Sequence, residues 1–306
     1  MPSVNEANET IRLCPSGDQL NRARPPHECL IRSLRQKENL MSAISSRGNL
    51  YDGSRVAEAK VRKWTCHVTL ETSMAVLPYI VFDVNETLLD LDALEPTFQR
   101  IFGDKLAMRL WFANFIMYSA ALTVANSYVP FTDIGGAVMK MLADVRGVTI
   151  DDRDRKELKE KFSTMPPHPE VPAALRKLRN SGFRLFTLTD NLLEVQERQL
   201  RHGGIVDLFE RRFSADSVHR HKPAPETYAY VARALDAKPS DFCLVACHTW
   251  DTLGAVAAGW EAALIKRPWN DVLSVGPQPQ IVGKDLNDVA DQLIARLDVR
   301  RLPVAR

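Results

Sequence analysis

Apolar and polar positions follow two different periods along the chain from Val76 onward. Short runs rich in β-branched and aromatic residues, typical of buried strands, recur between longer segments with helical spacing. Four runs predict strands, with the sequences VLPYIVFDV, FRLFTLTD, DFCLVACHTWD and EAALIKRP. The apolar spacing predicts helices over residues 94–129, 131–145, 151–162, 171–180, 193–202, 225–235, 252–258 and 286–297.

Strands that alternate with helices of this length predict a parallel sheet covered by helices on both faces. The fold class is therefore α/β, with a Rossmann-like sheet core. The helical stretch between the first strand and Phe162 is too long for one crossover, so we predict a helical cap inserted there. The predicted domains are a core formed by 76–93 and 164–306 and a cap formed by 94–163. Ligands of such a core bind beyond the carboxyl ends of its strands.

Residues 1–75 differ from the rest of the chain. Met1 to Ser73 is rich in Arg, Asn, Ser and Glu and has no sustained hydrophobic period, apart from a short helical pattern around Glu28–Leu40. A segment of this composition buries too little apolar surface to fold alone, so we predict a disordered or weakly ordered extension. Met74 directly precedes the first strand, and translation could begin there.

Composition excludes several classes of partner. Of the 306 residues, 45% are hydrophobic and 25% charged, which is typical of a globular protein, and the formal net charge is only +2. We therefore expect no nucleic-acid partner and no membrane association. The longest mostly apolar stretch, Leu106–Val129, is interrupted by polar side chains, which argues against a membrane-spanning helix.

The cysteines and the N-terminus bear on the compartment. Five cysteines show no regular framework of disulfide spacing, and they are Cys14, Cys29, Cys66, Cys243 and Cys247. The first ten residues, MPSVNEANET, lack the basic and then apolar order of a secretory signal. We therefore expect a cytoplasmic protein with free thiols.

Polar groups that can carry chemistry fall at or just past the predicted strand ends. They are Asp83, Thr189 with Asp190, Lys222 and Asp251. A carboxylate nucleophile needs a neighbouring cation to keep it ionised and donors for a substrate anion. It also needs a second acid that positions or activates water when a covalent ester is cleared. An aspartate, a threonine, a lysine and a second aspartate in this order meet those needs.

At these positions the chain resembles the haloacid dehalogenase (HAD) superfamily, over about Tyr79 to Leu297. The motifs FDVNETL, LTDN, KPAPETY and HTWDTLGA fall in the order of that family. The resemblance is strongest to the type II 2-haloacid dehalogenase branch, because the segment LWFANFIMYSAALTVANSYVPF is similar to that branch's first cap helices. The Trp250–Asp251 pair is also typical of that branch.

The resemblance implies a hydrolase of the (S)-2-haloacid dehalogenase type, with a HAD fold and a role for each motif. Asp83 would displace halide from a small organic acid and form an aspartyl ester, with Lys222 paired to it. Thr189 and the amides near Asp190 would hold the substrate carboxylate, and Asp251 would position or activate water. The residues expected to contact substrate are Asn85, Trp111, Phe112, Phe131, Asp190, Asn191, His248 and Trp250. The resemblance also implies a homodimer, no resident metal and no required cofactor.

Asn85 separates this chain from phosphatases of the superfamily, which carry an acidic proton donor at that position. Asparagine cannot exchange a proton at neutral pH, whereas halide leaves without protonation. The substitution is compatible with carbon–halogen cleavage and disfavours a phosphatase. A Mg²⁺-dependent phosphatase, with Asp83 and Asp251 as metal ligands, is kept as the alternative.

Two departures from the dehalogenase pattern bear on activity. Phe112 follows Trp111 where the family has an arginine, and the loss of such a charge-assisted donor costs roughly 1.5–3 kcal/mol. Arg109 lies about one helical turn earlier and could present its charge to the same side. His248 stands where dehalogenases tend to have asparagine, and it could donate a hydrogen bond or titrate near neutrality. A protein that kept the fold and lost the reaction is therefore a further alternative.

Two other groups of histidine and cysteine are predicted to play no catalytic part. Cys247 and His248 are adjacent on a predicted strand, so their side chains are expected to face opposite ways and not to form a catalytic pair. His219 and His221 flank Arg220, and we expect a solvated loop there, not a metal site.

Overall fold

The computed structural model describes residues 79–301 of the chain. The predicted extension over 1–75, its helical pattern around Glu28–Leu40 and the possible start at Met74 lie outside the described residues. In the part that the structure describes, no helix is long and apolar enough to cross a membrane.

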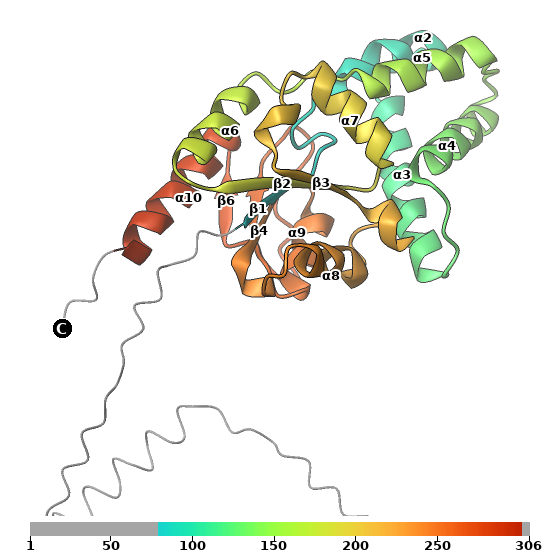
Figure 1. Cartoon of the computed structure of the whole chain (residues 1–306). Helices are drawn as coiled ribbons and strands as arrows, with labels where there is room; N and C mark the ends of the chain where they lie inside the picture. The colour runs from blue at the N-terminus through green and yellow to red at the C-terminus, as the bar shows by residue number, and fades with distance from the viewer. Residues whose placement is uncertain (1–78, 302–306) are drawn as a thin grey trace, which may run out of the picture. The chain divides into compact units, whose positions relative to one another are not determined.

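The core of the fold is a six-stranded sheet in the order β3-β2-β1-β4-β5-β6, with every neighbouring pair parallel (Figure 1). The strands are β1 (Tyr79–Phe82), β2 (Arg184–Thr189), β3 (Arg211–Ser214), β4 (Phe242–Ala246), β5 (Glu261–Ile265) and β6 (Ile281–Gly283). The predicted parallel α/β fold is thus confirmed. The four predicted strands became β1, β2, β4 and β5.

The edge strands β3 and β6 were not predicted from sequence. Each is short, and β3 begins with two arginines, so neither shows the continuous apolar run that marks a central strand. Edge strands pair on one side only and tolerate such polar positions, which explains why the pattern failed there.

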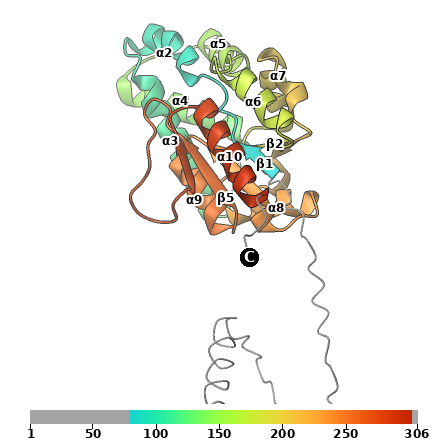
Figure 2. The same cartoon turned by 90° about the vertical axis from the view of Figure 1, so that its left-hand side faces the viewer.

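Helices cover both faces of the sheet, as Figures 1 and 2 show. The side chains of β1 alternate between the faces: Ile80 and Phe82 belong to one buried cluster, and Val81 belongs to the other. Helices α6 (Val171–Asn180) and α10 (Leu286–Arg301) contribute to the first cluster. The second cluster includes residues of α8 (Pro225–Ala234) and α9 (Thr249–Ala257). Burial of each large apolar side chain contributes about 1.5–3 kcal/mol and fixes the sheet between these layers.

The segment after β1 forms a separate helical group (Figure 1). It contains α2 (Glu95–Phe102), α3 (Ala107–Val124), α4 (Phe131–Arg146) and α5 (Asp152–Ser163). The expectation of continuous helical structure over 94–129 was wrong, because Gly103 adopts a left-handed conformation with φ of 69° and ends α2. The group agrees with the predicted helical insertion, and the domain boundaries themselves stay a prediction.

The remaining elements lie close to their predicted positions. Helix α7 (Leu193–His202) follows β2, and short 3-10 turns occur at Leu91–Leu94, Val206–Leu208, Ala215–Val218 and Pro239–Asp241. Helix α9 begins at Thr249, three residues before the prediction, because the extended backbone of His248 caps it. This early start places Asp251 in the first turn of a helix that points at the carboxyl ends of β1 and β4.

Candidate active site

Asp83 follows the last residue of β1 and is fixed there by its backbone. Its amide donates to the carbonyl of Val245 across the edge of the sheet, at 3.1 Å. The side chain is 7% exposed, so its carboxylate has lost most of its water and depends on protein partners. Its two oxygens have separate partners: Oδ1 accepts from Lys222 and Oδ2 accepts from Thr87 at 2.6 Å.

Lys222 joins three strand ends through one ammonium group. Nζ lies 2.8 Å from Oδ1 of Asp83 and 2.6 Å from Oδ2 of Asp251, and it donates to the carbonyl of Leu188 at 3.1 Å. Burial acts to lower the pKa of Lys222, but the carboxylates of Asp251 and Asp83 raise it overall. Burial likewise opposes ionisation of Asp83, yet Lys222 and His248 hold its pKa well below the ordinary range. The pair is therefore an ammonium facing an ionised carboxylate.

Asp251 is fully buried and has no free oxygen. Tyr228 donates its hydroxyl to Oδ1 at 2.7 Å, and Lys222 donates to Oδ2. Burial and the nearby charge of Asp83 raise the pKa of Asp251 to about 6, against the opposing effect of Lys222. The arrangement makes Asp251 an anchor for the Lys222 ammonium.

Thr87 ties the loop after β1 to the loop after β4. Its hydroxyl donates to Asp83 and accepts from the amide of Cys247 at 3.0 Å. One hydroxyl can serve as donor and acceptor at once, so Thr87 fixes the rotamer of the Asp83 carboxylate. Sequence reasoning did not single out Thr87, although it lies within the same FDVNETL motif.

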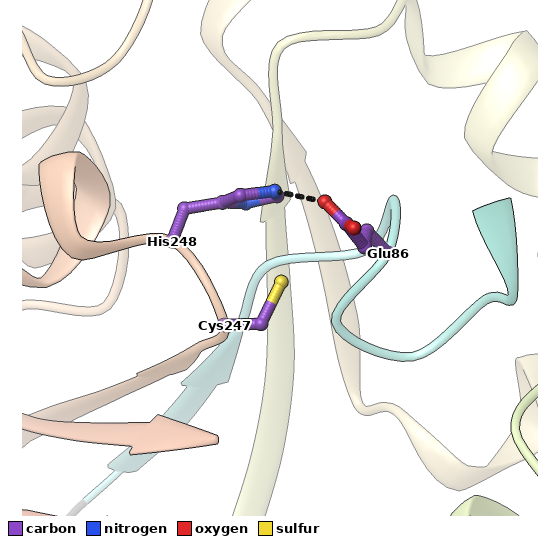
Figure 3. Close-up of side chains that lie close together, drawn as sticks. All are labelled: Glu86, Cys247 and His248. Atoms are coloured by element: carbon purple, nitrogen blue, oxygen red, sulfur yellow. Dashed lines mark hydrogen bonds and ion pairs between the residues drawn. The ribbon is translucent and has the colours of Figure 1, made fainter. Parts of the chain in front are cut away.

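Glu86, Cys247 and His248 form a buried group in which one potential ligand atom from each lies within 4.8 Å of the others (Figure 3). The Nε2 atom of His248 lies 2.8 Å from Oε2 of Glu86. The predicted opposite orientation of Cys247 and His248 is wrong, because β4 ends at Ala246 and its pleat does not continue through the loop.

This group has the donor types of a Zn²⁺ site, but its atoms are already satisfied or protonated. The Glu86 carboxylate is ion-paired with His248 and with Arg109. Burial raises the pKa of the Cys247 thiol, which keeps the thiol protonated. We therefore interpret the group as an internal ion-paired network that lies against Asp83.

Arg109 connects helix α3 to this network. Its guanidinium pairs with Glu86 through Nη1 and with Asp92 through Nη2. The charge of Arg109, which we expected near the Phe112 side of the helix, is thus used to hold the helical insertion against the loop after β1. Burial opposes ionisation of Glu86, but its two cationic neighbours, His248 and Arg109, lower its pKa.

The side chain of Asn85 is hydrogen-bonded to two other side-chain amides. Its Oδ1 accepts from Gln199 Nε2 at 3.1 Å and from Asn191 Nδ2 at 3.4 Å, and all three side chains are buried. Thr189 is buried at the end of β2, where its Oγ1 accepts a hydrogen bond from the backbone amide of Asn191 at 3.3 Å. The structure thus places Asn85, Thr189 and Asn191 together in one amide and hydroxyl cluster.

Asp190 supports the backbone of Lys222 and does not point to open space. Its Oδ1 accepts from the backbone amide of Lys222 at 2.9 Å, and His221 Nδ1 lies 3.8 Å away. The expectation of a solvated loop is wrong for His221, which is 0% exposed and packs against Tyr128 and Phe131. It holds for His219, which is exposed.

Two of the predicted aromatic residues meet at the network, and two do not. The rings of Phe112 and Trp250 lie 5.8 Å and 5.1 Å from the His248 ring, centroid to centroid. Trp111 donates to the carbonyl of Gly135 and lines a cavity of about 250 Å³ between the helical insertion and Val195 of α7. Phe131 stacks on Phe115 at 4.0 Å. The structure therefore places Trp111 and Phe131 among helix-packing contacts.

Comparisons with known proteins all point to one family. Residues 78–259 match the model of the haloacid dehalogenase-like hydrolases. The chain is 27% identical over 203 residues to an (S)-2-haloacid dehalogenase of Pseudomonas sp. (strain YL), a match that covers 65% of this chain and 87% of that protein. It is 25% identical over 197 residues to haloacetate dehalogenase H-2 of Moraxella sp. (strain B), with 63% and 88% covered.

A solved structure shares the fold. The L-2-haloacid dehalogenase from Xanthobacter autotrophicus, with chloropropionic acid covalently bound, superposes with a TM-score of 0.67 at 17% identity. The superposition covers 74% of this chain and all of that chain. At this identity the likeness establishes the arrangement of the sheet and helices, and the site itself has to be argued from the residues of this chain.

Proposed function

This chain belongs to the haloacid dehalogenase-like hydrolases, and on that premise we propose that it hydrolyses the carbon–halogen bond of small 2-haloalkanoic acids through an ester of Asp83. Its curated relatives include dehalogenases of (S)-2-haloacids and of haloacetate. The substrate class follows from those relatives, and the mechanism follows from the charges around Asp83.

The observation that carries the proposal is the ion pair of Asp83 with Lys222 in a nearly water-free site. A desolvated carboxylate that stays ionised is a stronger nucleophile than one surrounded by water. Lys222 keeps the charge in place, and Thr87 orients the carboxylate without removing its negative charge. An attack of Asp83 on the carbon bearing the halogen forms a C–O bond and releases the halide with the bonding electrons.

The second step clears the ester. Water attacks the Asp83 carbonyl carbon, the C–O bond to the carbonyl carbon breaks, and the 2-hydroxy acid leaves. Asp251 and Tyr228 hold the Lys222 ammonium beside this carbon, where it balances the charge that develops on oxygen. Thr189 and the backbone amides after β2 supply donors for the substrate carboxylate, and Trp250 and Phe112 supply apolar contact for its short chain.

The alternative of a Mg²⁺-dependent phosphatase is not favoured by the arrangement of charges. Lys222 already lies between Asp83 and Asp251, and it contacts both carboxylates at hydrogen-bond distance. Asn85, which accepts hydrogen bonds from two amides, has no proton to give a leaving alcohol. We therefore propose a reaction without a required metal or other cofactor, carried out by a homodimer, as the resemblance implies. We place it in the cytoplasm because of the cysteine pattern and the N-terminal sequence.

The experiment is a substrate screen in which halide and phosphate are measured in parallel. Chloroacetate, bromoacetate, fluoroacetate and 2-chloropropionate are the halide substrates, and a panel of phosphomonoesters with Mg²⁺ tests the alternative. Asp83→Ala is the blank. Halide release that depends on Asp83 supports the proposal. Phosphate release without halide would replace it with the phosphatase, and no release of either would favour a protein that has kept the fold and lost the reaction.

A further inference from the structure

The step that clears the ester needs a group that takes a proton from water, and Asp251 is badly placed for it. Both of its oxygens accept hydrogen bonds, from Tyr228 and from Lys222, and the side chain is completely buried. Because Asp251 is 0% exposed, an incoming water cannot reach either oxygen unless the groups packed around it move. A carboxylate held in this way can position its partner lysine, but it is poorly placed to take a proton from an incoming water.

His248 is the titratable side chain that lies next to Asp83 on the opposite side. Its Nδ1 is 3.2 Å from Oδ2 of Asp83, whereas Lys222 binds Oδ1. The contact is within ion-pair distance but off the hydrogen-bond direction, and among the described residues Nδ1 has no hydrogen-bond partner. Once the ester has removed the charge of Asp83, this ion pair is lost, and the buried ring nitrogen beside the ester can meet a water that approaches it.

Glu86 fixes the other end of the ring. Its Oε2 lies 2.8 Å from Nε2 of His248 (Figure 3). The proton on Nε2 therefore points at Glu86, and Nδ1 is left to face Asp83. Glu86 has a left-handed backbone with φ of 62°, which costs a non-glycine residue roughly 1–2 kcal/mol. Its carboxylate is also anchored by Arg109. Such strain at a buried carboxylate is typical of functional sites.

We propose that Nδ1 of His248 is the base that activates water against the Asp83 ester, and that Glu86 is the positioning residue that orients the ring for this task. This inference rests on the proposed function, because it assigns a role within the second half of the same reaction. It gives His248 a catalytic role and leaves Asp251 as the anchor of Lys222.

The protons balance over one cycle. Ester formation at Asp83 expels halide, and the imidazolium of His248 then releases one proton to solvent. Nδ1 takes a proton from water as the water oxygen bonds to the ester carbonyl carbon. The departing alkoxide of the 2-hydroxy acid takes that proton from His248. Asp83 is regenerated as a carboxylic acid and returns its proton to His248, so the net products are the hydroxy acid, halide and one proton.

The charge environment of His248 changes in the required direction during this cycle. Burial lowers its pKa, but the carboxylates of Asp83 and Glu86 raise it well above 6.5 in the free enzyme. Esterification removes the charge of Asp83, and Lys222 and Arg109 on neighbouring elements remain positive. The pKa of His248 therefore falls when the ester forms, which is when a base is needed.

The test uses His248→Gln with 2-chloropropionate or chloroacetate, whichever the wild type turns over. Glutamine keeps a polar side chain of similar reach and cannot act as a base. We expect a burst of about one halide per active site, followed by steady turnover roughly 10²-fold or more below wild type. Intact-protein mass spectrometry should show the ester accumulating on Asp83. His202→Gln, the same change at an exposed histidine, is the matched control and should behave as wild type.

A second variant tests the role of Glu86 separately. Glu86→Gln keeps an oxygen for Nε2 but removes the negative charge, so it lowers the pKa of His248. The limb of the kcat profile that rises with pH should then move to lower pH, an effect that a purely structural residue would not produce. A profile that stays in place overturns the positioning role.

The outcomes separate this inference from the proposed function. Undiminished turnover in His248→Gln, or loss of the halide burst together with turnover in a variant that unfolds at the wild-type temperature, overturns the role of His248 and leaves the Asp83 mechanism intact. An absence of halide from wild-type protein with every probe overturns the proposed function and this inference with it.

Discussion

The ammonium of Lys222 lies 2.8 Å from Oδ1 of Asp83, although 139 residues separate them in the chain. The same ammonium lies 2.6 Å from Asp251, so one buried cation holds two buried carboxylates. Removal of the cation would leave two negative charges facing each other without water. Both the stability of the core and the reactivity of Asp83 should therefore depend on the Lys222 side chain.

Lys222→Met should therefore be inactive and strongly destabilised. Loss of one partner from a buried charge pair costs about 3–5 kcal/mol in the free energy of unfolding, which urea denaturation measures. Lys222→Met combined with Asp251→Asn should be less destabilised than Lys222→Met alone, because it removes one of the two repelling carboxylates. A single variant that unfolds at the wild-type urea concentration would show that the pair does not matter for stability.

The raised pKa of Asp251 predicts a pH dependence of stability. Because folding raises this pKa from 3.8 to about 6, the native state prefers the protonated acid and loses stability as the pH rises between these values. Asp251→Asn is neutral and lacks this loss. Its stability relative to wild type should increase by about 1 kcal/mol between about pH 5 and about pH 8. Denaturation curves at both pH values check the sign, and a relative decrease would contradict it.

Asn85→Asp tests the phosphatase alternative directly. The new carboxylate would still accept from Gln199 and Asn191, so we expect a folded protein. We expect no Mg²⁺-dependent phosphate release, since Lys222 continues to occupy the space between Asp83 and Asp251. Halide release should fall, because a second negative charge near Asp83 opposes the approach of an anionic substrate. Phosphatase activity in this variant would reverse our choice between the two functions.

Arg109 and Glu86 should be energetically coupled. Arg109→Gln leaves the buried Glu86 with His248 as its cationic partner, and we expect a loss of roughly 1–3 kcal/mol in the free energy of unfolding. The double variant with Glu86→Gln should lose less than the sum of the two single variants. Lys140→Gln, at an exposed ion pair with Asp144, is the matched control and should change stability by under about 1 kcal/mol. If the losses in the free energy of unfolding of the two single variants add up to that of the double variant, the Arg109–Glu86 ion pair does not couple helix α3 to the site.

The sequence predicted the parts of the site that lie on strong periodic elements. Asp83, Thr189 and Asp251 follow or adjoin central strands, whose apolar runs are easy to identify, and parallel strands bring their carboxyl ends together. The family order of the motifs placed Lys222 beside them. The search for apolar runs missed β3 and β6, because these short strands lie at the edges of the sheet and have no continuous apolar run.

The remaining contacts depend on rotamers and loop conformations that no period encodes. Glu86 reaches His248 because its backbone adopts a positive φ, which a glutamate seldom does. Cys247 and His248 share one side because β4 ends at Ala246, before both of them. Trp111 faces Gly135 within the helical insertion, a choice between two sides of one helix that sequence alone did not resolve.

Transfer of oxygen from labelled water is the most direct measurement of the ester at Asp83. A single turnover of 2-chloropropionate in H₂¹⁸O, with enzyme in excess, should place ¹⁸O in the side chain of Asp83 and leave the hydroxyl of the product unlabelled. Mass spectrometry of the peptide containing Asp83 and of the product gives both values. Label in the product hydroxyl, with none in Asp83, would mean that water displaces the halide directly and that no ester forms.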